Sequence, residues 1–122
     1  MVNTVELIGR LVADPVVKTL EDGIKVSSIR LAVTRPFKNG NGEFDVDFIP
    51  ITFWYGAAQL AEQYCGKGDL IFVRGRVVNK VQVINETNYH FTEIIGDRLV
   101  LLCHKFKQDS NEEQEDPLKV LI

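Results

Sequence analysis

Apolar and polar residues alternate over five separate stretches of the chain, and each stretch is rich in β-branched residues. An apolar residue at every second position is typical of a strand with one buried face. The pattern predicts strands over Asn3–Val12, Lys25–Thr34, Asp45–Trp54, Asp69–Val78 and His90–Leu102. Turn-forming sequences lie between several of them, namely LEDGIK (20–25), NGNGE (39–43) and NETN (85–88), and the first two strands are expected to pair.

A single segment departs from this β pattern. Residues Gly56–Tyr64 have a helical composition and apolar side chains four positions apart, and Gly66 and Gly68 are expected to end the helix. About five strands with one helix between the third and the fourth is the order of a Greek-key OB barrel. An immunoglobulin-like sandwich would need more strands and no helix. The sequence therefore predicts an all-β fold, a five-stranded Greek-key OB-fold barrel with one short helix between strands 3 and 4.

Charge divides the chain of 122 residues into two parts. Residues 1–105 carry 12 basic and 12 acidic side chains, whereas residues 106–122 carry 2 and 5, which accounts for the net charge of −3. We predict one OB domain over residues 1–106 and an acidic, disordered tail over residues 107–122. The alternative for the tail is a docking peptide whose acidic residues meet a basic groove. A neutral body does not exclude nucleic acid, because phosphate binding depends on the local field.

Motifs of known enzyme classes are absent from the sequence. There is no nucleophile elbow, no phosphate-binding glycine loop and no HExxH, so no catalytic residue, cofactor or metal is expected. Glu43, Asp45 and Asp47 alternate and would be the minimum for a nuclease cation site, but the solvent-facing rim of a hairpin is favoured. Cys65 and Cys103 are expected to be reduced. Neither a secretory signal nor a run of eighteen apolar residues is present, so we expect a cytoplasmic protein that does not enter membranes.

Aromatic residues in the segment DFIPITFW (47–54) point to a binding function. Period-two geometry directs Ile49, Ile51 and Phe53 to the core, and it directs Phe48 and Trp54 to the opposite face. Either another subunit covers that face, or it is a platform on which bases stack. Basic residues in or beside the predicted strands favour the platform, because phosphates need cations. These residues are Arg10, Lys18, Arg35, Lys38, Arg74, Arg76 and Lys80.

Four segments in order resemble the bacterial single-stranded DNA-binding protein family: ELIGRLVADPVVK (6–18), IRLAVTRPF (29–37), DFIPITFWYGAAQLAEQYCGKGDLIFVRGRV (47–77) and FTEIIGDRLVLL (91–102). The resemblance covers nearly all of residues 3–102. It implies an OB fold, a homotetramer, and sequence-independent binding of single-stranded DNA in replication, recombination and repair. It also implies that Phe37, Phe48 and Trp54 stack on bases. By the same resemblance, Lys18, Lys67 and Lys80 line the DNA path.

The chain departs from the family pattern at three places. A further stacking Trp of the family aligns near Val81–Val83, where no aromatic stands, and a basic residue of the family is Pro50 here. The family's long linker and its acidic tip, which recruits replication and repair proteins, are replaced by a short tail ending DPLKVLI. A phage or plasmid version, or an accessory OB protein such as a primosomal one, would fit that tail better than a housekeeping copy. Two further alternatives stay open: an OB-fold nuclease that uses Glu43, Asp45 and Asp47, and a domain whose apolar second face is only an interface.

Overall fold

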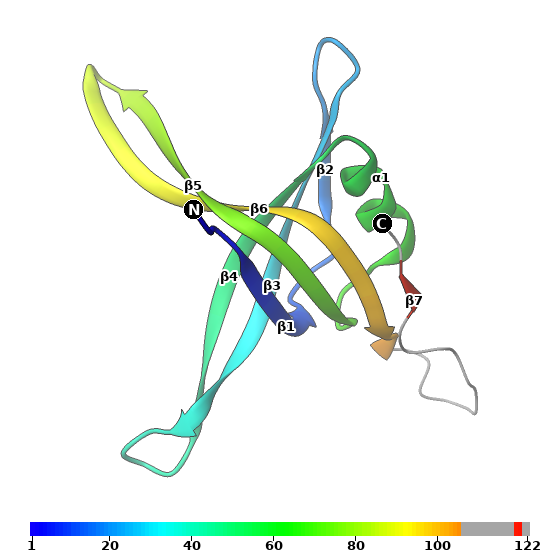
Figure 1. Ribbon diagram of the computed structural model, residues 1–122, viewed down its shortest axis with the longest axis vertical. Coiled ribbons are helices and arrows are strands. Elements are labelled where there is room, and N and C mark those ends of the chain that lie inside the picture. Colours follow the sequence, from blue (N-terminus) through cyan, green and yellow to red (C-terminus); the bar gives the residue numbers. More distant parts are fainter. Residues whose placement is uncertain (106–118, 121–122) are drawn as a thin grey trace.

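The structure is a computed structural model that describes residues 1–105 and 119–120. Its elements are β1 (Val5–Leu11), β2 (Val16–Thr19), β3 (Lys25–Lys38), β4 (Phe44–Trp54), α1 (Tyr55–Tyr64), β5 (Leu70–Ile84), β6 (Thr87–Cys103) and β7 (Lys119–Val120). Strands β1, β5, β6, β4 and β3 are neighbours in this order, and the pairing of β1 with β3 closes the barrel (Figure 1). Only β4 and β6 run parallel within it. The predicted OB barrel, with its helix between the third and fourth barrel strands, is confirmed.

The core occupies the inside of this barrel. Ile51 and Phe53 are at most 1% exposed, as the alternation in β4 predicts, and Ile49 packs against the core while remaining partly accessible. Helix α1 adds Ala58 and Ala61 to the same cluster. A Cβ atom at Gly96 of β6 would overlap the Phe53 ring, so this glycine allows strand and ring to approach closely.

The β3–β4 and β5–β6 hairpins extend beyond the barrel, and their strands are longer than the sequence predicts (Figure 1). β3 continues to Lys38, and β5 and β6 continue to a two-residue turn at Asn85 and Glu86. Both turn residues have positive φ, 53° and 67°, as a type I′ turn requires. The predicted turn over residues 85–88 is therefore wrong at its second half, where residues 87 and 88 belong to β6.

Strand β2 is an element that the sequence analysis misses. It forms a hairpin with β3 over Val16–Thr19, whereas β1 pairs with β3 only at Arg10 and Leu11. Four residues are too few to display an alternation of apolar and polar positions. The first two predicted strands therefore do pair, but over a shorter stretch than expected.

The far end of the chain is described at two residues only. Lys119 and Val120 form β7, which pairs with β6 at Leu101 and Val100, in place of the disorder expected there. The remainder of the predicted tail lies outside the described residues. Both cysteines are free: Cys65 is buried and Cys103 is exposed. In the part of the chain that the structure describes, no helix is long and apolar enough to span a membrane.

Candidate nucleic-acid interface

Four neighbouring strands present one continuous outer face, which we call the open face. In β4, Ile51 and Phe53 point into the barrel, so the residues between and beyond them point outward. Thr52 pairs with Ile95 of β6, and the same alternation then assigns the outward positions of β6 and of its partner β5. The open face consists of Val26, Ser28, Arg30 and Ala32 of β3, Phe48, Pro50, Thr52 and Trp54 of β4, Tyr89, Phe91, Glu93 and Ile95 of β6, and Arg76, Val78, Lys80 and Gln82 of β5.

A groove of about 660 Å³ lies on this face, where the end of β4 and the start of α1 lie beside β6 and β5. It is lined by Trp54, Tyr55, Gly56, Ala57, Arg76, Val78, Asn79, Lys80, Ile95, Gly96 and Asp97. The structure therefore brings together three of the predicted site residues, Trp54, Arg76 and Lys80. The two cations can neutralise phosphates, and the partly exposed indole beside them offers a flat surface on which a base can stack.

Lys80 is held directly beside the indole. Its Nζ lies 5.9 Å from the centroid of the Trp54 ring and 3.3 Å from Oε1 of Glu93. The other carboxylate oxygen of Glu93 accepts a hydrogen bond of 2.7 Å from the Thr52 hydroxyl. The ammonium group is thus fixed at the edge of the groove, where a phosphate would compete with Glu93 for it.

Tyr55 is a groove residue that the sequence analysis misses. Its side chain is 64% exposed, and its ring centroid lies 6.3 Å from that of Trp54 at an angle of 43°. The residue has a φ of 59°, in the left-handed region that a bulky residue adopts at some cost. Such strain occurs at functional sites, and here it places a second aromatic ring beside Trp54 at the junction of β4 and α1.

Two cations flank the aromatic residues of β4 on the open face. Lys18 pairs with Val26, which pairs in turn with Trp54, so Lys18 stands in the same cross-strand row two strands away. Arg30, which the sequence analysis misses, pairs with Pro50, the position where the family pattern has a basic residue. Arg30 is exposed, and no ion pair or hydrogen bond of its side chain occurs among the described residues. It stands between Phe48, 54% exposed, and Trp54.

The end of the β3–β4 hairpin carries a second aromatic cluster. Phe37 is 79% exposed, and the Nζ of Lys38 lies 5.8 Å from the ring centroid of Phe44, a half-exposed aromatic that the sequence analysis misses. A register shift between Thr34 and Lys38 separates these residues from the regular part of the ladder. Phe37 and Lys38 therefore stand at the hairpin tip, away from the groove at Trp54.

The remaining predicted basic residues either bind other groups of the protein or lie outside the groove. Arg35 donates two hydrogen bonds, of 3.0 and 2.9 Å, to the carboxylate of Asp47, which lowers the pKa of Asp47 and raises the pKa of Arg35. Arg10 donates to the carbonyl of Gly68, and Arg74 pairs with Asp97 at 3.3 Å. None of these three arginines lines the groove, and neither does Lys67, which lies in the loop after α1. Their DNA contacts stay predictions.

Two of the three carboxylates considered for a nuclease site, Asp45 and Asp47, have other partners. Asp45 accepts a hydrogen bond from the Asn39 amide and lies 3.8 Å from Arg35, while Asp47 is paired with the same arginine. Within residues 1–105 and 119–120, no group of three or more His, Cys, Asp or Glu is arranged to hold a metal ion. Asp45 and Asp47 therefore bind Arg35 and Asn39 of the same β3–β4 hairpin.

The closed barrel and its basic, aromatic groove define an OB-fold domain of the nucleic-acid-binding class. The Single-strand binding protein family matches residues 2–102, and the chain belongs to this family. It is 38% identical over 98 residues, 80% of this chain and 87% of the relative, to "Single-stranded DNA-binding protein B" of Bacillus subtilis (strain 168). It is 36% identical over 121 residues, 97% of this chain and 81% of the relative, to "Single-stranded DNA-binding protein" of Caldanaerobacter subterraneus. The solved structure "Plasmodium falciparum SSB complex with ssDNA" matches with a TM-score of 0.71 and 28% identity, over 84% of this chain and 96% of the other.

Proposed function

We propose that this protein binds and protects single-stranded DNA without reading its sequence, in replication, recombination and repair, and that it is not an enzyme. The observation that carries the proposal is the placement of Lys80 over Trp54 in a groove that also holds Tyr55 and Arg76. Membership of the Single-strand binding protein family supports it. The two relatives named above, and the protein complexed with single-stranded DNA, support it as well.

The groove suits single strands better than duplex. Stacking on Trp54 requires an unpaired base whose face is free, whereas duplex bases are already stacked on each other. Arg76 and Lys80 would neutralise phosphates, and Lys18 and Arg30 would continue that contact along the open face. Because every base has a π-face and every nucleotide has a phosphate, such contacts bind without a sequence preference.

Titration of a labelled thymidine oligomer tests the proposal directly. We expect fluorescence anisotropy to rise on binding, and Trp54 emission to fall because a base covers the indole of the single tryptophan in the chain. An equal length of duplex is the control and should quench far less. Equal binding of duplex and single strand would contradict the proposal, as would cleavage of the oligomer in magnesium.

We further propose that the chain assembles as a homotetramer, as its resemblance to the family implies. A short apolar row on the outside of the barrel supports assembly: Ile8 of β1, 54% exposed, pairs with Phe72 of β5, which is partly exposed. Burying such a row against a second copy removes apolar surface from water. Light scattering that gave only a monomer of 13.8 kDa at micromolar concentration would contradict this proposal.

Residues 1–106 are proposed as the DNA-binding domain and residues 107–122 as a separate acidic tail that contacts replication or repair proteins. The run Asp109–Asp116 carries no apolar side chain to bury, which supports the division. Truncation after Gln108 removes β7, which pairs with β6 only at Val100 and Leu101 among the described residues, so the melting temperature of the barrel should change little. A large fall in melting temperature would show instead that the end of the tail stabilises the barrel.

A further inference from the structure

Two aromatic residues on the β5–β6 hairpin have no role in the barrel. Tyr89 is 51% exposed and Phe91 is 45% exposed, and both lie in the part of β6 that extends beyond the barrel (Figure 1). Neither belongs to the buried core. Large aromatic side chains left beside each other in water mark a surface at which a partner binds.

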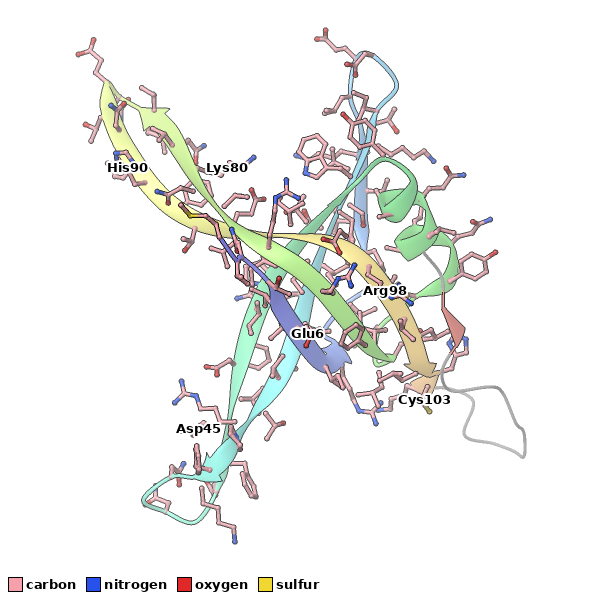
Figure 2. All side chains as sticks on the ribbon, viewed as in Figure 1. Glu6, Asp45, Lys80, His90, Arg98 and Cys103 are labelled. Atoms are coloured by element: carbon pink, nitrogen blue, oxygen red, sulfur yellow. The ribbon has the colours of Figure 1, made fainter. Side chains whose placement is uncertain are left out.

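Register places both rings on the open face. Phe91 lies directly opposite Lys80, and Tyr89 lies directly opposite Gln82, so the two rings share one side of the hairpin with the lysine whose Nζ lies over the Trp54 ring. His90, between them in sequence, points to the other side, as Figure 2 shows for His90 and Lys80. Val81 and Val83 also point to that other side.

We propose that Tyr89 and Phe91 form a second stacking platform for bases of the single strand whose groove contains Trp54. The platform stands on β6, next to the β5 stretch Val81–Val83 that lacks an aromatic. The inference rests on the proposed function. We assign nucleic acid to this platform because it lies next to two cations of the groove. Arg76 and Lys80 stand on the same face of β5, the strand that pairs with β6, and can neutralise the phosphates of a strand that crosses the platform.

The first test compares Tyr89→Ala/Phe91→Ala with His90→Ala. One stacked base contributes about 5- to 150-fold in affinity, so we expect the double variant to bind a long thymidine oligomer at least fivefold more weakly than wild type. His90→Ala removes an exposed ring from the opposite side of the same strand and should bind like wild type. Circular dichroism and thermal melting of each variant show whether the barrel remains folded.

A gain-of-signal test does not depend on loss of binding. In a Trp54→Phe background, Phe91→Trp places the single tryptophan on the proposed platform, and His90→Trp places it on the opposite side. We expect the thymidine oligomer to quench the emission of Trp54→Phe/Phe91→Trp strongly and that of Trp54→Phe/His90→Trp much less. Equal quenching of the two would overturn the platform.

The outcomes separate this inference from the proposed function. If the wild-type protein does not bind single-stranded DNA, the function itself is wrong. If it binds, and Tyr89→Ala/Phe91→Ala binds equally well, only the platform is overturned. A double variant that changes subunit assembly in light scattering while its affinity for DNA is retained would assign the two rings to a second copy of the chain, which also overturns the inference.

Discussion

The two halves of β5 have the same alternating pattern of apolar residues, but these residues are buried in one half and exposed in the other. Within the barrel, Ile71 and Val73 are at most 1% exposed; along the hairpin, Val81 and Val83, on the same side of the strand, are 55% and 65% exposed. The register shift at Arg74 and Gly75 marks the change from one half to the other. The comparison shows that alternation specifies a strand, whereas closure of the barrel decides which apolar side chains are covered.

The halves therefore differ in what their apolar residues contribute. A fully buried aliphatic side chain contributes about 1.5–3 kcal/mol to folding, and a side chain in water contributes little. The barrel half holds the fold together. The hairpin half leaves its aromatic and aliphatic side chains free for a ligand, and its two-residue turn keeps the strands paired up to Ile84 and Thr87.

The largest expected difference is between two isoleucines of this one strand. Ile71→Ala should lower the free energy of unfolding by about 2–5 kcal/mol, because it leaves a cavity in the core. Ile84→Ala, at an exposed position of the hairpin, should change it by no more than about 0.5 kcal/mol. Urea denaturation of both variants measures the difference. Similar losses would show that the hairpin is packed against something in solution.

Cys65 offers an independent readout of the same loss. Burial, followed by the nearby Asp69 carboxylate, raises the pKa of the Cys65 thiol to about 12. At pH 8 the folded protein therefore holds Cys65 as an unreactive thiol, since the thiolate is the nucleophile. The exposed Cys103 serves as the internal control for labelling. Ile71→Ala should speed labelling of Cys65 and not of Cys103, and Ile84→Ala should change neither.

Sequence alone predicts the barrel because its signals are local. The alternation that buries Ile51 and Phe53, and the alanine-rich segment after Trp54, are each readable within one element. Two of the missed residues, Arg30 and Phe91, have a position that depends on register between strands. Arg30 is placed on the open face by its pairing with Pro50, and Phe91 by its pairing with Lys80. Bulges at Thr34 and Arg74 shift those partnerships, and no pattern within a single strand reports them.

Trp54 tests whether the open face serves binding or packing. Trp54→Ala should weaken binding of single-stranded DNA by about 1–3 kcal/mol, the usual contribution of one base stacked on an aromatic ring. The partly exposed ring should contribute little to folding. A core tryptophan would behave in the opposite way, with a loss of about 3–5 kcal/mol in stability and unchanged binding. Titration and urea denaturation of the same variant decide between the two.

Two arginines of β3 sharpen the comparison further. Arg30 faces outward between Phe48 and Trp54, whereas Arg35 is bound to Asp47 by two hydrogen bonds. Arg30→Ala should lower the slope of log affinity against log salt by about 0.7, the value for one phosphate contact with a single strand. Arg35→Ala should lower it by less, because Asp47 already neutralises that guanidinium. Equal slopes for the two variants would contradict the assignment of Arg30 to the DNA path.

The smallest expected effect concerns the carboxylate that holds Lys80. Glu93→Gln removes the charge that pairs with Lys80 at 3.3 Å and keeps an oxygen that can accept from Thr52, so Lys80 becomes free for a phosphate. A partly exposed ion pair of this kind contributes about 0.2–1 kcal/mol, so binding of single-stranded DNA should tighten only about 1.4- to fivefold. Glu62→Gln is the matched control: it removes the same charge from a pair with Lys25, 3.6 Å away, outside the groove. Titrations at low salt, where screening is weakest, give the clearest difference. Weaker binding by Glu93→Gln would show that the carboxylate positions Lys80 for DNA rather than competing with it.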